Sequence, residues 1–258
     1  DRKTSSMAKP SPKYRYNPEP RLSANQLSEY LKASPTRRKG IIKDAKFPRT
    51  IIVAQYKGAR ESIGKFICSP ERDAGILAAG IASLTAREEE LDASDWTKDD
   101  SRRSIEAITT FHNSIQAIGI NKLDCRPILP GQPKLDISGV EISVALDATT
   151  HRLKGGENMV GGVICLFSKA TETSGTARAE RCKVAAVLAL RFATEHLGFL
   201  GKADPKLCWA IDVMNGKPYR APDSYKMLLD NMSVSCEEIA LRWGSIDAPA
   251  DYDGPPIT

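Results

Sequence analysis

The hydrophobic and polar positions of this chain follow a helical period in some segments and a strand-like period in others. Residues 99–118 place apolar side chains every three or four positions, at Ile105, Ile108, Phe111, Ile115 and Ile118, and Gly119 follows. This spacing puts the apolar side chains on one face of a helix, and a glycine is a common residue at a helix end. Residues 140–146 instead alternate apolar and polar side chains, which is typical of a strand with one buried face.

Strand-like and helical segments continue to alternate after this point. Strand-like patterns cover residues 123–129, 160–167 and 207–214, and the nearly uniform apolar character of 160–167 favours a central strand. Helical patterns cover residues 176–197 and 224–243. The order is therefore helix, three strands, helix, strand, helix. We predict an α/β (α+β) fold with a mixed central sheet of about four strands flanked by helices.

The segment before this core is mostly helical by pattern. Ser23 and Gln26 form a capping-box sequence, and Ser34-Pro35 is a typical helix start. The first residues of the chain are polar and rich in proline, as are the last, so both ends have little to bury. The predicted organisation is a disordered segment 1–20, a helical region 21–98, a core 99–247 and a flexible tail 248–258.

The composition of the chain limits the classes of protein to which it could belong. Hydrophobic residues make up 41% and charged residues 27% of the chain, as in soluble globular proteins. Apolar runs stay well short of the roughly 18 residues of a membrane span, so we expect no membrane partner and a cytoplasmic location. The net charge of +5 permits contact with phosphate without requiring it. The six cysteines form no CxxC pair, which gives no zinc-ligand pattern.

Residues 139–169 hold the most informative arrangement of charge. The pattern predicts two strands joined by a charged turn, with Asp147 at the end of the first strand and Lys169 just past the second. With the order of elements around it, this arrangement resembles the αβββαβ core of the PD-(D/E)XK, or restriction-endonuclease-like, superfamily. The resemblance covers residues 99–215 approximately and rests on a weakly specific motif, because an acid that ends a strand is common.

The resemblance implies a nuclease site at one end of the sheet. In that family an acid of the second strand and an acid-x-lysine motif of the third hold Mg²⁺, which activates water and stabilises charge on a phosphate. Asp147 matches the second-strand acid and would be the metal ligand. Glu106 on the preceding helix stands where some members keep another acid. The implied cofactor is Mg²⁺ or Mn²⁺.

The third strand departs from the family's motif. Val163 falls at the acid position and Cys165 at the lysine position. Neither side chain can hold magnesium or supply an ammonium group. Asp147 fits a structural role equally well, because an aspartate can accept backbone hydrogen bonds in the turn that follows it.

A relocated site is the alternative to a broken one. Lys169 could replace the missing lysine, with Glu141 or Glu157 as the second acid. However, Glu141 is separated from Asp147 by roughly 20 Å along an extended strand, too far to share one ion, and Glu157 is similarly far from Lys169.

Two other groups of charged residues stand out. Arg37, Arg38 and Lys39 form a basic run on a predicted helix, where they could contact phosphates or could simply form a solvated face. Asp212 interrupts the apolar strand 207–214, and we expect it on the solvent side of that strand rather than in the core.

Three functions fit these observations. We favour a nucleic-acid-binding or accessory protein with a degenerate nuclease-like core, acting on DNA or RNA in DNA processing or in defence against mobile elements. The second is an active Mg²⁺-dependent nuclease, a phosphodiester hydrolase, with relocated residues centred on Asp147, Lys169 and Glu106. The third is a non-catalytic subunit that binds a protein partner in a larger complex.

Overall fold

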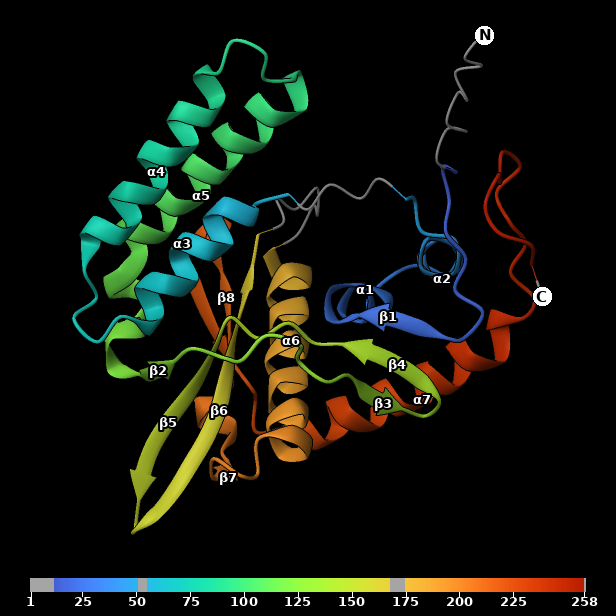
Figure 1. Ribbon diagram of the computed structural model, residues 1–258. Helices are drawn as coiled ribbons and strands as arrows, with labels where there is room; N and C mark the ends of the chain where they lie inside the picture. The colour runs from blue at the N-terminus through green and yellow to red at the C-terminus, as the bar shows by residue number, and fades with distance from the viewer. Residues whose placement is uncertain (1–11, 51–54, 168–174, 258) are drawn as a thin grey trace, which may run out of the picture.

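The computed structural model describes residues 12–50, 55–167 and 175–257, in which helices pack against a mixed sheet (Figure 1). The expected α+β class with N-terminal helices is confirmed. The helices are α1 (Ala24–Tyr30), α2 (Pro35–Lys46), α3 (Lys57–Cys68), α4 (Ala74–Glu89), α5 (Asp95–Ile118), α6 (Gly175–His196) and α7 (Tyr225–Trp243). The strands are β1 (Arg21–Ser23), β2 (Asp124–Arg126), β3 (Leu135–Ile137), β4 (Val140–Ser143), β5 (Ala148–Lys154), β6 (Glu157–Leu166), β7 (Lys202–Ala203), β8 (Trp209–Asp212) and β9 (Lys217–Arg220). No described helix combines the length and apolar character needed to cross a membrane.

The central sheet has the strand order β2-β5-β6-β8-β9, and β7 adds to β6. β2, β5 and β6 are antiparallel neighbours, whereas β8 runs parallel to β6 after the crossover through α6. The predicted strands 123–129, 140–146, 160–167 and 207–214 correspond to β2, β4, β6 and β8, and the prediction missed β5. The observed order is α5, β2, β5, β6, α6, β8 and α7, with β3 and β4 inserted after β2.

The central hairpin differs from the predicted one. Residues 140–146 do not pair with β6, because β4 lies in a second sheet of order β1-β4-β3 and runs parallel to β1. The partner of β6 is β5, whose Ala148 lies opposite Val163. The sequence of β5 does not show the alternation typical of a strand, because its first three residues are all buried and its last three are all exposed. Asp147 consequently precedes β5 instead of ending the strand before it.

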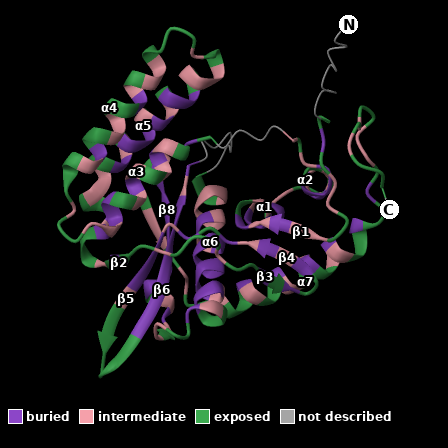
Figure 2. Cartoon of the chain, viewed as in Figure 1, coloured by how far each residue is buried: buried purple, intermediate pink, exposed green. Residues whose placement is uncertain are grey.

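β6 is buried along most of its length (Figure 2), and its two faces belong to different hydrophobic cores. Val160 and Ile164 pack with α6, α7, α1 and α2, while Val163 and Cys165 pack with α3, α4 and α5. Between them, a Cβ on Gly161 would lie 2.4 Å from the carbonyl oxygen of Leu207, so this strand needs glycine for its close approach to the neighbouring turn.

The helical region 21–98 contributes to both cores. Ser23 and Gln26 make the predicted capping box, and Ser34 caps α2 with proline at its first position, so these two helix starts are confirmed. α1 and α2 lie on the side of the sheet that α6 covers, and α3 and α4 lie with α5 on the other side (Figure 1).

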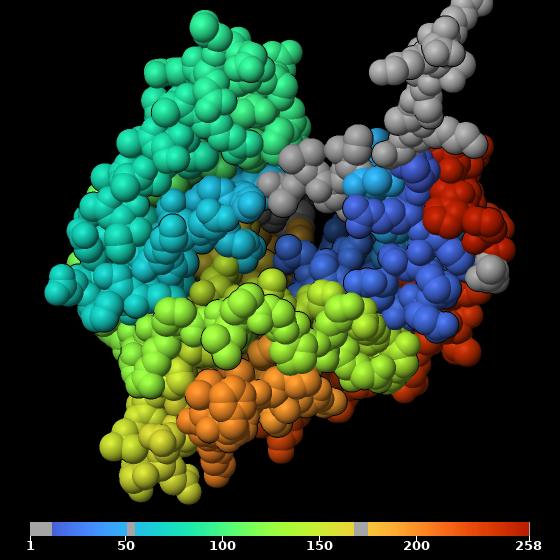
Figure 3. Space-filling view, in the orientation of Figure 1, coloured from blue at the N-terminus to red at the C-terminus, as the bar shows by residue number. Residues whose placement is uncertain are grey.

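The N-terminal segment 12–20 lies within the stretch expected to be disordered, and here the structure differs. Tyr14 is buried, and the backbone N–H of Lys13 donates to Asp253 at 2.7 Å. The two ends of the described chain therefore meet beside α2, as Figure 3 shows in blue and red. The ammonium of Lys46 is buried there and donates to the carbonyls of Trp243 and Ile246 at 2.7 and 3.0 Å, which caps the end of α7.

Candidate functional site

Asp147 lies at the start of β5 on the side of the sheet that α3 covers, and its carboxylate is buried, with 4% of the side chain exposed. Its Oδ1 accepts a hydrogen bond from the Arg60 guanidinium of α3 at 2.5 Å. Its Oδ2 accepts a hydrogen bond from the backbone N–H of Cys165 in β6 at 2.6 Å. Both carboxylate oxygens are therefore engaged by the protein itself.

Arg60 is held in this position by more than Asp147. Its second terminal nitrogen donates to the carbonyl of Cys165 at 2.9 Å, and its guanidinium lies 4.9 Å from the centre of the Phe167 ring. Burial raises the pKa of Asp147, and the charge and hydrogen bonds of Arg60 and Cys165 act in the opposite direction. The arginine thus supplies, next to Asp147, the positive charge that a nuclease would take from its metal ion.

A second acid at the same end of the sheet is also paired with an arginine. Asp212, the last residue of β8, is completely buried and forms an ion pair with Arg178 near the start of α6. It also accepts hydrogen bonds from the backbone and side chain of Asn215, at 3.2 and 2.9 Å. The predicted solvent exposure of Asp212 is wrong, because α6 covers this face of β8. Leu166 of β6 lies opposite Asp212.

The two positions at which this chain differs from the acid-x-lysine motif lie in the hydrophobic core. Val163 and Cys165 are both completely buried on the face that α3 and α5 cover. Burial, together with the nearby Asp147 charge, raises the pKa of the Cys165 thiol well above its usual range. The two side chains therefore fill space between the sheet and its helices.

The other acids considered for a relocated site lie elsewhere. Glu106 is exposed on α5, whereas Ala107 and Ile108 of the same turn face the core. Glu157 pairs in register with Lys154 at the far tip of the β5-β6 hairpin. Lys169, the remaining catalytic candidate, lies outside the described residues.

The described residues around Asp147 include no ready-made group of metal ligands. Among the described residues, no group of three or more histidines, cysteines or acids is arranged to hold a metal ion. The acid nearest the expected centre, Asp147, faces an arginine, and hard divalent cations need several oxygen ligands.

The basic run on α2 is placed against acidic partners. Arg37 donates to Glu29 at 2.7 Å, and Arg38 lies 3.6 Å from Glu238 while its guanidinium covers the Tyr30 ring at 5.1 Å. Lys39 is exposed. The two arginines thus connect α2 to α1 and α7, which leaves the lysine as the more accessible charge of the three.

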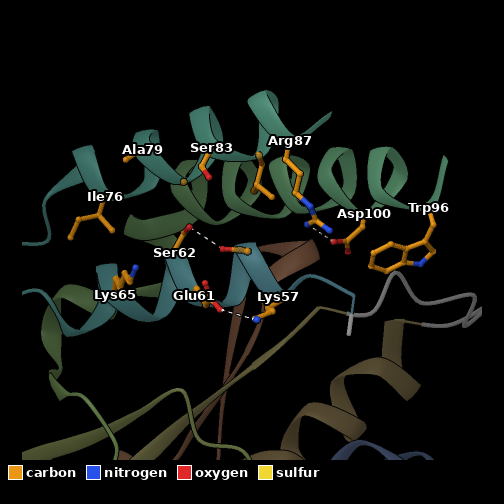
Figure 4. Close-up of a pocket in the computed structure, with 13 residues that line it drawn as sticks. Lys57, Glu61, Ser62, Lys65, Ile76, Ala79, Ser83, Arg87, Trp96 and Asp100 are labelled. Atoms are coloured by element: carbon orange, nitrogen blue, oxygen red, sulfur yellow. Dashed lines mark hydrogen bonds and ion pairs between the residues drawn. The ribbon is translucent and has the colours of Figure 1, made fainter. Parts of the chain in front are cut away.

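A groove of about 750 Å³ lies between α3 and α4 on the outer side of the helical layer (Figure 4). Four of its charged residues pair inside it, with Lys57 3.9 Å from Glu61 and Arg87 3.3 Å from Asp100, and Lys65 also lines it. The helices approach closely at its floor, where a Cβ on Gly80 would lie 2.2 Å from the Ser62 hydroxyl. Glycines inside both helical segments were the available sequence signal for this close approach.

Sequence reasoning missed the arginines of this end of the sheet. Arg60 and Arg178 both lie in helical segments with many other charged residues, and no local pattern marks their partners. A comparison with models of known protein families gives no match for this chain, and neither does a comparison with curated proteins. The arrangement of side chains is therefore the basis on which a function can be proposed.

Proposed function

We propose that this protein is a nucleic-acid-binding or accessory protein whose restriction-endonuclease-like core does not cleave, acting in DNA processing or in defence against mobile elements. The observation that supports the absence of cleavage is the Arg60–Asp147 pair at the end of the sheet. The order α5, β2, β5, β6, α6, β8 supports the nuclease-like core.

A cation at Asp147 would compete with a guanidinium that is itself bonded to the Cys165 carbonyl and stacked near Phe167. Breaking this pair costs less than the about 3–5 kcal/mol of a fully buried pair, because 38% of the Arg60 side chain is exposed, but it still leaves the guanidinium beside the incoming cation. Val163 and Cys165 offer the cation no oxygen ligand from their side chains in return.

Binding to nucleic acid is supported by charge. The chain has a net charge of +5, and arginines and lysines are exposed on several elements, including Lys39 on α2 and Lys65 on α3. Contacts with phosphate provide affinity that depends on salt and is largely independent of base sequence.

The test combines cleavage and binding on the same preparation. The full chain is incubated with plasmid, single-stranded DNA and RNA in Mg²⁺ and in Mn²⁺, and binding is measured in parallel over a range of salt concentrations. We expect no metal-dependent cleavage and binding that weakens as salt rises. Metal-dependent cleavage that disappears in Asp147→Asn would overturn the proposal.

Two further outcomes separate the alternatives. Cleavage that persists unchanged in Asp147→Asn points to a contaminant or to a different centre. Failure to bind any of the nucleic acids at low salt would overturn the binding half of the proposal and favour a protein-interaction subunit. A triple variant of Arg37, Arg38 and Lys39 to alanine then asks whether α2 carries the contact, since unchanged binding would exclude it.

A further inference from the structure

A polar pocket of about 350 Å³ lies where the N-terminal segment crosses the residues that follow α2, next to β1 and the end of β4. Three arginines from three different segments line it: Arg15, Arg21 and Arg49. Uncharged polar side chains complete much of the wall: Asn17, Ser23, Gln26, Thr50 and Ser143. These side chains indicate a site for a charged ligand, because an apolar ligand would leave their polar groups without hydrogen-bond partners.

The backbone fixes the positions of the arginines. The backbone N–H of Arg15 donates to the Pro48 carbonyl at 2.8 Å, and the N–H of Thr50 donates to the Lys13 carbonyl at 2.8 Å. Arg15 and Arg49 are therefore carried by two segments that pair side by side. Arg21 is carried by β1, which is held in the second sheet by β4.

The charge of the pocket is unbalanced toward positive. Among the described residues that line it, the one carboxylate is that of Asp44, which is largely exposed. Arg15 donates one hydrogen bond to the Thr50 carbonyl at 3.3 Å, and Arg21 lies 3.6 Å from Glu141. A guanidinium has five N–H groups, so donors remain on both side chains for a ligand.

Thr50 lines the pocket, but its hydroxyl oxygen is buried beneath the surface and has no hydrogen-bond partner within the described part of the chain. A buried hydroxyl without a partner is unfavourable by about 1–3 kcal/mol. The arginines, and not this hydroxyl, offer donors to a ligand.

We propose that this pocket binds a phosphate ester, either a free nucleotide or the terminal phosphate of a nucleic-acid strand. The planar donor groups of arginine match the oxygens of phosphate, and three guanidinium groups around one pocket balance the charge of the phosphate. A neighbouring pocket of about 350 Å³ shares Arg49 and is otherwise lined by Lys13, Tyr14 and the acid Asp251, so it gives room for the uncharged part of the molecule. The site stands on its own residues and does not depend on the proposed function.

The experiment measures binding by the full chain to ligand pairs that differ in one phosphate. The pairs are AMP with adenosine, and a short single-stranded DNA with a 5′-phosphate and the same DNA with a 5′-hydroxyl. We expect the phosphorylated member of each pair to bind at least about tenfold more tightly. Arg15→Gln, Arg21→Gln and Arg49→Gln each weaken this binding about tenfold, whereas Arg102→Gln, an exposed ion-paired arginine of α5, leaves it unchanged.

Thr50→Val is a second control, in the wall of the same pocket. This nearly isosteric change removes a buried hydroxyl that has no partner, so the melting temperature stays the same or rises, while the affinity for AMP stays within about twofold. A tenfold loss of AMP affinity in this variant would argue against the assignment of the ligand contacts to the arginines.

The outcomes distinguish the two proposals. If neither phosphorylated ligand binds better than its partner, or if the arginine variants bind both normally, the pocket proposal is overturned. Equal binding of both DNAs, insensitive to Arg15 and Arg49, overturns the pocket and leaves nucleic-acid binding intact. Binding of AMP without binding of either DNA supports the pocket and overturns the nucleic-acid function.

Discussion

Replacing Asp147 by alanine tests whether the acid at the end of the sheet is a structural partner or a metal ligand. The substitution leaves the buried N–H of Cys165 without its acceptor, which costs about 1–3 kcal/mol. It also removes the partner of Arg60, but the full 3–5 kcal/mol for breaking a buried pair does not apply, because 38% of the Arg60 side chain is exposed and it can turn to water.

The expected loss of stability is therefore about 2–4 kcal/mol. For a chain of this size each kcal/mol lowers Tm by about 2–4 °C, so we expect a fall of roughly 10 °C. Asp147→Asn should cost less, since the amide oxygen can still accept from Cys165. Asp92→Ala, an exposed position after α4, is the matched control and should stay within about 0.5 kcal/mol of the unaltered chain.

The assay is thermal and urea unfolding in EDTA and again in Mg²⁺. A double-mutant cycle with Arg60→Met should give a coupling energy of about 1–3 kcal/mol, because the two side chains are in direct contact. The reasoning is refuted if Asp147→Ala leaves Tm unchanged in EDTA. It is refuted equally if Mg²⁺ raises the Tm of the unaltered chain and not that of Asp147→Ala, which would identify a metal ligand.

Arg178→Met should destabilise the fold by about 3–5 kcal/mol in urea unfolding, because it leaves the carboxylate of Asp212 buried and unpaired, and a loss below about 1 kcal/mol would contradict this. Burial, and then the nearby Arg126 charge, lower the pKa of His151, so NMR should place its titration below about 6.5. Because the unfolded chain then binds this proton more readily than the folded protein, the contribution of His151 to stability should fall as the pH drops through that value. A titration midpoint above that value would reverse the sign. In the folded protein a thiol reagent should modify the half-buried Cys68 first, while Cys165 should react only after denaturant is added, and rapid labelling of Cys165 would show that its pocket opens.

Local patterns predicted the helices of this fold well and its strand pairing less well. The stripe of α5 is confirmed because Ile108 and Phe111 do face the core and Gly119 ends the helix with a φ of 72°. β5 could not be recognised, because its burial changes from complete to absent along its length and shows no alternation. The choice between β4 and β5 as the partner of β6 depends on contacts between distant segments, which no local period encodes.

The candidate site, too, was only partly predictable from local sequence patterns. Asp147 was identifiable as an acid following an apolar run, but Arg60 precedes it by 87 residues and nothing in the sequence around either one selects the other. Asp212 was misjudged for a related reason, since its burial depends on Arg178 of a helix 34 residues earlier. Pairing between buried charges is fixed by the tertiary arrangement, so sequence patterns indicate the acids and not their partners.

The contact between the two ends of the chain has a consequence for the order in which this protein can be completed. Lys13 is joined to Asp253 across 240 residues, and Lys46 is joined to Ile246 across 200. During synthesis these bonds cannot form until residues 246–253 have emerged, whereas the α3 to β6 contacts around Asp147 can form earlier. The segment that carries Arg15 and Arg49 is therefore among the last parts to settle, and a chain shortened before residue 251 would keep the paired acids of the sheet while losing the bonds that close this end of the molecule.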